Sequence, residues 1–200
     1  MRNIALFLTY LGTDYHGWQV QPHSNSVQEE LQKALSTLLR ENIEIVGAGR
    51  TDTGVHARKM IAHFDFGPLD GKQLVYKLNK ILPRDIAVQS VDEVAEDMHA
   101  RFSAKSRTYH YFLHLSKNPF LRAYSWQMYG DLDFDKMNEA AKVLMEYRDF
   151  TSFSKTNTDT KTNDCTITEA HWENVGGNQW RFTISANRFL RNMVRAIVGT

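Results

Sequence analysis

The feature of the sequence that most restricts the fold is the rhythm of its hydrophobic residues. Segments whose apolar residues alternate or run together, as in strands, take turns with segments whose apolar residues repeat every three to four positions, as in helices. Strand, helix and strand recur at similar spacing in both halves of the chain, although no sequence repeat is visible. Because most of the strands alternate, a doubly wound parallel sheet is disfavoured.

The first half contains helix boundaries as well as periodic patterns. In chain order, we predict a strand, a helix, two strands, a helix and a strand over residues 2–10, 26–40, 43–46, 59–66, 72–82 and 86–91. Ser26 and Glu29 form a capping box at the start of the first helix. Asp70 is placed to cap the second helix and Pro83 to end it.

The second half repeats this pattern with different residues. We predict a strand, a helix, two strands and a last helix over residues 107–115, 135–147, 166–175, 179–187 and from about 188. Gly176 and Gly177 supply the turn between the two later strands. In the last helix, Arg188, Arg191 and Arg195 are expected opposite an apolar stripe.

These elements predict an α+β protein. We expect two similar halves, residues 1–104 and 105–200, that share one largely antiparallel, mixed sheet with helices on one side. The first half contains the glycine-rich loop described below.

The charges nearly cancel over the whole chain but are unevenly distributed. Lys and Arg number 24 and Asp and Glu 23, and the formal net charge of +1 alone does not favour nucleic-acid binding. Residues 100–130 and 181–200, however, contain several Lys and Arg and no acidic residue. We therefore predict basic faces of the kind that bind RNA phosphates.

Cysteine content and hydropathy point to a location. The single cysteine, Cys165, cannot form an intramolecular disulfide, which favours a reducing cytoplasm. The apolar residues 4–11 are too few to span a bilayer and are interpreted as part of a buried strand. We expect a cytoplasmic protein without membrane association.

The loop VGAGRTDTGVHA, residues 46–57, places Arg50 and Asp52 on a tight bend, and four interpretations compete. Asp52 could cap its own turn, or the loop could cradle phosphate, although known phosphate loops lead into a helix rather than a strand. Asp52, His56 and His63 could bind a metal, but their spacing matches no helical metal motif. Finally, Asp52 could be a general base or nucleophile whose charge is stabilised by the nearby Arg50.

The strand RTYHYF, residues 107–112, alternates cationic and aromatic side chains. Arg107, Tyr109 and Tyr111 share one face, and His110 and Phe112 share the other. Such rings interleaved with cations suit base stacking and phosphate contact, whereas the alternative is that the rings belong to the core.

Taken together, these segments resemble the tRNA pseudouridine synthase A family. GAGRTDTGVHA is similar to the catalytic loop of that family, whose motif is close to G-R-T-D-x-G-V-H. Further similar segments follow in family order across nearly the whole chain: YLGTDYHGWQVQ, SVQEELQKAL, LNKILPRDIAV, HARFSAKSRTYHY, DFTSF and ANRFLRNMVRAIVGT.

The resemblance implies an activity and roles for individual residues. It implies isomerisation of uridine to pseudouridine in the anticodon stem-loop of tRNA by a homodimer of the pseudouridine synthase fold, without metal or organic cofactor. Asp52 matches the catalytic aspartate, Tyr109 the tyrosine that stacks on the target base, and Arg195 the basic partner of the aspartate. The substrate-binding candidates are Arg50, which matches the arginine that displaces the base, together with Arg107, Arg191 and His56.

Two other classes of function remain as alternatives. One is a noncatalytic RNA-binding module with the same fold, and the other is a metal-dependent hydrolase that uses Asp52, His56 and His63. Family members continue beyond the position of Thr200, so the second half is also expected to be truncated at its C-terminal end.

Overall fold

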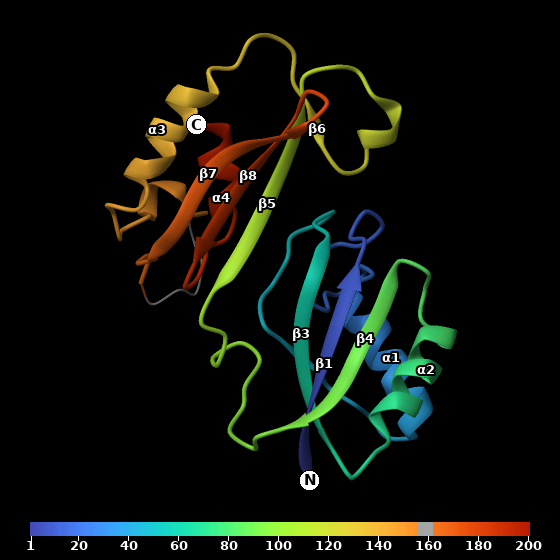
Figure 1. The fold of residues 1–200 in the computed structure, drawn as a ribbon. Coiled ribbons are helices and arrows are strands. Elements are labelled where there is room, and N and C mark those ends of the chain that lie inside the picture. The colour runs from blue at the N-terminus through green and yellow to red at the C-terminus, as the bar shows by residue number, and fades with distance from the viewer. Residues whose placement is uncertain (156–161) are drawn as a thin grey trace. The chain divides into compact units, whose positions relative to one another are not determined.

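The computed structural model describes residues 1–155 and 162–200 and divides the chain into two compact units, Met1–Ala104 and Lys105–Thr200 (Figure 1). The first unit contains β1 (Arg2–Tyr10), α1 (Val27–Leu39), β2 (Val46–Gly47), β3 (Ala57–Phe66), α2 (Gly71–Ile81) and β4 (Ile86–Val94). The second contains β5 (Arg107–His114), the 3-10 turn η1 (Pro119–Leu121), β6 (Trp126–Gln127), α3 (Phe134–Val143), the 3-10 turn η2 (Thr151–Phe153), β7 (Ile167–Gly176), β8 (Gln179–Ala186) and α4 (Met193–Gly199). In the part of the chain described, no helix is long and apolar enough to cross a membrane.

Each unit contains its own four-stranded sheet. The strand orders are β2-β3-β1-β4 and β6-β5-β8-β7, and every pair is antiparallel except β5 with β6. The α+β class is confirmed, whereas the prediction of one sheet shared by both halves concerns how the two units meet and stays a prediction. Strand β1 pairs on both edges with strands of its own unit, so the hydrogen-bond ladders form within each unit.

The core of the first unit lies between one face of its sheet and both helices. Leu6 of β1 lies opposite Ala62 of β3 and both are fully buried. Leu31 of α1 and Leu78 of α2 are equally buried in the same cluster. Removing these side chains from water is the main stabilising contribution to this packing.

The predicted starts of α1 and α2 are confirmed by their caps. The side chain of Ser26 accepts the Glu29 N–H (3.2 Å), and that of Asp70 accepts the Gln73 N–H (3.1 Å). These bonds satisfy N–H groups that have no partner within the first helical turn.

In the second unit the rings of β5 belong partly to the core. Tyr109 and Tyr111 lie opposite Ile184 and Phe182 of β8, and both tyrosines pack against a cluster that includes Met193 of α4. Helix α3 contributes to the same cluster, so both helices of this unit cover one face of its sheet. The core interpretation of these rings therefore holds in part.

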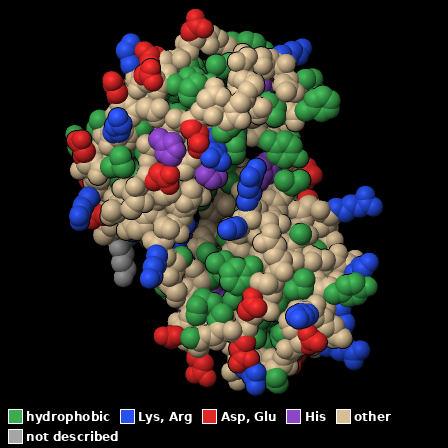
Figure 2. Space-filling view, in the orientation of Figure 1, with side chains coloured by type: hydrophobic (Ala, Val, Ile, Leu, Met, Phe, Trp, Pro, Cys, Tyr) green, Lys and Arg blue, Asp and Glu red, His purple; other side chains and the backbone are tan. Residues whose placement is uncertain are grey.

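Large aromatic side chains also lie on the surface, where Figure 2 shows scattered hydrophobic groups. The exposed fraction is 89% for Phe120, 78% for Tyr129 and 76% for Phe102. All three lie within residues 100–130, the stretch that has no acidic residue.

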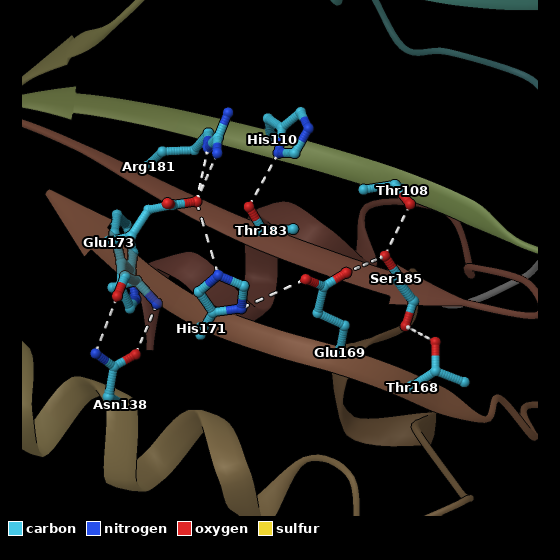
Figure 3. A network of polar contacts seen from close by, with 11 residues as sticks. Thr108, His110, Asn138, Thr168, Glu169, His171, Glu173, Arg181, Thr183 and Ser185 are labelled. Atoms are coloured by element: carbon cyan, nitrogen blue, oxygen red, sulfur yellow. Dashed lines mark hydrogen bonds and ion pairs between the residues drawn. The ribbon is translucent and has the colours of Figure 1, made fainter. Parts of the chain in front are cut away.

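Two asparagines on helices bind the outer edges of the sheets in the same way. The Asn79 side chain of α2 donates to the Val88 carbonyl and accepts the Val88 N–H, both at 2.8 Å, on edge strand β4. Asn138 of α3 binds Trp172 of edge strand β7 through the same pair of groups, at 3.0 and 2.6 Å (Figure 3). Each amide therefore replaces one residue of a neighbouring strand.

The strand predicted over residues 43–46 is largely absent, because only Val46 and Gly47 pair with β3. Ile43 and Ile45 are buried as strand residues would be, but helix side chains bind their backbone. Gln32 accepts the Ile45 N–H (3.2 Å) and Gln28 donates to the Ile45 carbonyl (2.8 Å). The apolar pattern correctly predicted that these residues are buried, but it did not predict which groups bind their backbone.

The last helix begins later than predicted. It starts at Met193 because Asn192 adopts φ 70°, a left-handed conformation outside the helical range. Arg188 and Arg191 therefore precede α4, and only Arg195 of the three predicted arginines is helical. The apolar residues of the predicted stripe still pack against the core of this unit.

Candidate functional site

The glycine-rich loop joins β2 to β3 in the first unit, and the segment after β1 holds it in place. The hydroxyls of Tyr10 and Thr51 lie 2.8 Å apart, and the Trp18 N–H donates to the Thr51 carbonyl (3.1 Å). The Gly54 N–H donates to the Tyr15 carbonyl (3.3 Å). The backbone on both sides of residue 52 is therefore fixed by one neighbouring segment.

Two glycines of that segment make the close approach possible. A Cβ atom on Gly12 would lie 2.1 Å from the Val55 carbonyl oxygen, and one on Gly17 would lie 2.4 Å from the Thr51 oxygen. Gly17 also adopts φ 95°, which residues with a side chain rarely adopt. A side chain at either position would displace the loop.

Asp52 lies in a turn that the backbone closes. The Val55 N–H donates to the Asp52 carbonyl (3.2 Å), and the residue is half-buried. Among the described residues of its own unit, the Asp52 carboxylate has no hydrogen-bond or ion-pair partner. The interpretation of Asp52 as a side-chain cap of its own turn is therefore not supported, whereas a carboxylate available for chemistry is.

The neighbouring candidates differ in exposure. Arg50 is exposed, and His56 is half-buried with its Nδ1 accepting the Gly12 N–H (2.9 Å). In the neutral ring this bond leaves the proton on Nε2. The loop thus positions a carboxylate, a guanidinium and an imidazole within seven residues.

His63, the third ligand of the metal alternative, lies on β3. Its Nδ1 accepts the Ala100 N–H (3.2 Å), and burial, reinforced by the nearby His99, lowers the pKa of its imidazole. No group of three potential metal ligands occurs among the residues that the structure describes. Asp52, His56 and His63 are not brought together as the hydrolase alternative requires.

The other candidates lie in the second unit. The Tyr109 ring is half-buried and meets Phe189 edge to face, with ring centroids 5.1 Å apart. Arg107 donates from Nη1 to the Asn187 carbonyl (2.9 Å), so this side chain holds the end of β8. Arg191 and Arg195 are exposed.

The predicted site residues thus form two groups, one in each unit. Asp52 lies with Arg50 and His56 in the first unit, while Tyr109 and Arg195 belong to the second. The expected pairing of Asp52 with Arg195 joins the two groups and stays a prediction.

Sequence reasoning missed the residues that support the loop. Tyr15 is 5% exposed and donates from its hydroxyl to Asp85 (2.8 Å). Burial, together with this bond, raises the pKa of Tyr15 well above its ordinary value. The signal was present in YLGTDYHGW, where glycines alternate with aromatic residues next to a strand.

The face of the second sheet opposite its helices carries a polar network (Figure 3). Arg181 donates from Nε and Nη2 to Oε1 of Glu173 (3.0 and 2.6 Å), and this contact lowers the pKa of Glu173. The His171 ring lies 3.7 Å from both Glu169 and Glu173. The charges in this network are largely paired with one another.

Comparisons with known proteins point in the same direction. A family model described as tRNA pseudouridine synthase matches residues 7–103 and 140–200. The tRNA pseudouridine synthase A of Bacteroides thetaiotaomicron is 56% identical over 203 residues, which cover 100% of this chain and 76% of that protein. Those of Porphyromonas gingivalis and Bacillus licheniformis are 52% and 42% identical, covering 100% and 96% of this chain and 81% and 80% of their own lengths.

Proposed function

Because the chain belongs to the tRNA pseudouridine synthase family, whose members are isomerases, we propose that it converts uridines of the tRNA anticodon stem-loop to pseudouridine with Asp52 as nucleophile. The observation that supports this proposal is the state of Asp52. Its loop backbone is held by bonds to Trp18 and Tyr15, while its carboxylate has no partner among the described residues of its own unit. A fixed carboxylate without a structural task suits nucleophilic catalysis.

The reaction explains why a carboxylate is needed. The bond between uracil N1 and the ribose carbon breaks, the base turns, and a new bond forms from C5 to the same carbon. C5 then loses its proton and N1 gains one, so the atoms balance. A carboxylate that bonds covalently to the ribose or to the base holds the intermediate during the turn. Product and substrate are isomers, so the net reaction consumes no redox equivalent.

The remaining candidates have complementary roles in this proposal. The target uridine leaves its stack, Arg50 occupies the vacated space, and Tyr109 stacks on the extruded base. Arg195 pairs with Asp52 and keeps its carboxylate ionised in a desolvated site. Arg107, Arg191 and His56 contribute to substrate binding.

The proposed assembly is a cytoplasmic homodimer that binds tRNA across basic surface from both subunits. The acid-free stretches 100–130 and 181–200 support this part of the proposal. Phosphate contacts release counterions, so the affinity for tRNA should fall steeply as salt is raised.

The decisive experiment replaces Asp52 with asparagine, which keeps the size of the side chain but removes the nucleophile. We expect Asp52→Asn to form no pseudouridine in single-turnover assays while its Kd for tRNA stays within about twofold, since binding depends on many cationic contacts. Asp97→Asn, an exposed carboxylate outside the loop, is the matched control and should react at the parental rate.

Each alternative predicts a different result. If Asp52→Asn formed pseudouridine at the parental rate, Asp52 would be a turn residue and not the nucleophile. A noncatalytic RNA-binding module would bind tRNA without forming product in any variant. A metal-dependent hydrolase would lose activity when a chelator is added to the parent protein.

A further inference from the structure

Residues 117–129, which follow β5, present large aromatic side chains to solvent. Phe120 and Tyr129 are the two most exposed aromatic residues among those described, and Trp126 is 49% exposed. Figure 2 shows hydrophobic side chains at the right-hand edge of the unit that contains β6. Several exposed aromatic rings on one segment mark an interaction site rather than chance exposure.

The segment is a folded turn rather than an irregular loop. The Asn118 side chain accepts the Phe120 N–H (3.0 Å), and the Leu121 carbonyl accepts the Ser125 N–H (2.9 Å). His114, which is 2% exposed, lies with Nδ1 2.9 Å from the Ser125 hydroxyl. Strand β6 then pairs with β5, so both ends of the turn are anchored to the sheet.

The charged residues of this segment are all positive. Lys117 and Arg122 are exposed, and residues 100–130 contain no acidic residue that could neutralise them. Aromatic rings beside exposed cations are the combination that binds single-stranded nucleic acid, because the rings stack on bases while the cations contact phosphates.

We propose that residues 117–129 form a stacking platform for unpaired bases of the RNA substrate. Phe120 and Tyr129 stack on bases, and Lys117 and Arg122 contact the adjacent phosphates. This inference rests on the proposed function in taking tRNA as the RNA, but it concerns binding residues that the catalytic roles above do not include.

A second copy of the chain fits this surface less well than RNA does. In a two-fold symmetric dimer the same patch meets itself. Lys117 and Arg122 would then face identical cations without an acidic residue of residues 100–130 to offset them. RNA phosphates, in contrast, neutralise both charges.

The segment also lies between the two ranges, residues 7–103 and 140–200, that match the family model. A platform there would add RNA contacts outside the matched ranges, while the glycine-rich loop lies inside the first of them.

The test measures binding of a synthetic anticodon stem-loop to the whole chain at fixed salt. We expect Phe120→Ala and Tyr129→Ala each to weaken binding by roughly 5- to 150-fold, the range for loss of one base stack. Phe120→Tyr keeps a ring and should bind as the parent does. Tyr147→Ala, which removes an aromatic residue that is 61% exposed outside the segment, is the matched control and should change nothing.

A second RNA identifies stacking as the cause. A set of stem-loops is made, each with one unpaired nucleotide replaced by an abasic site. The stem-loop that lacks the base stacked on Phe120 should bind the parent and Phe120→Ala equally, because neither protein can make that stack. Equal binding of the unmodified stem-loop by parent and Phe120→Ala would overturn the proposal. So would a change in oligomeric state with RNA affinity unaltered, which would mark the patch as an interface between copies.

These outcomes can be separated from failure of the proposed function. The catalytic proposal fails if the parent forms no pseudouridine or if Asp52→Asn forms it normally. The platform proposal fails if the Phe120 and Tyr129 variants bind the stem-loop as tightly as the parent does. That measurement does not depend on product formation.

Discussion

Gly12→Ala tests whether the segment after β1 positions the loop that carries Asp52. The new Cβ atom would lie 2.1 Å from the Val55 carbonyl oxygen, so the loop would have to retreat by roughly 1.3 Å to reach an ordinary contact of 3.4 Å. The bond from the Gly12 N–H to His56 would be disturbed as well. Gly12 does not adopt a positive φ, so the clash is the main perturbation.

The expected size of the effect follows from this displacement. Overpacking of a buried site costs about 1–3 kcal/mol of the free energy of unfolding. A shift of roughly 1 Å at the reacting group lowers the rate by about 10²-fold. In the proposed binding mode most phosphate contacts come from cations outside this loop, so the Kd should change far less than the rate, with the loss limited to contacts of Arg50 and His56.

Urea unfolding and single-turnover pseudouridine formation measure both consequences. Gly67→Ala is the matched control, because a Cβ atom there meets nothing within 4 Å. It should stay within about 0.5 kcal/mol of the parent in stability and react at the parental rate. A Gly12→Ala protein with parental stability and rate would refute the claim that this close approach positions Asp52.

Two further predictions concern stability. Asn79→Ala removes both side-chain bonds to Val88 and should lower the free energy of unfolding by about 1–2 kcal/mol in urea titrations, whereas Asn42→Ala, an exposed control, should have almost no effect. The lowered pKa of His63 means that the unfolded chain binds a proton more readily, so stability should decrease as the pH falls below about 6.5. The free energy of unfolding of His63→Gln, measured at several pH values, should depend less on pH than that of the parent. An unchanged pH dependence would show that His63 is not the group responsible.

Local signals in the sequence predicted most elements but not all of their partners. The Ser26 and Asp70 caps act within three residues of their own positions, so the sequence pattern contains all the information they require. The later start of α4 depends on Asn192 in a left-handed conformation, which no apolar stripe indicates. The error at residues 43–46 arose because periodicity reports burial but not which group binds the backbone.

The candidate site also has features that the sequence predicted and features that only the structure revealed. The sequence by itself determined the family and the candidates Asp52, Tyr109 and Arg195, because a dense motif in a fixed order needs no coordinates. Only the tertiary structure decided that Gly12 and Trp18 hold the loop from more than thirty residues away and that the carboxylate of Asp52 has no partner in its own unit. Close approach between distant segments depends on how the strands pair, and the physical information for that contact is spread over the whole unit rather than contained in any one motif.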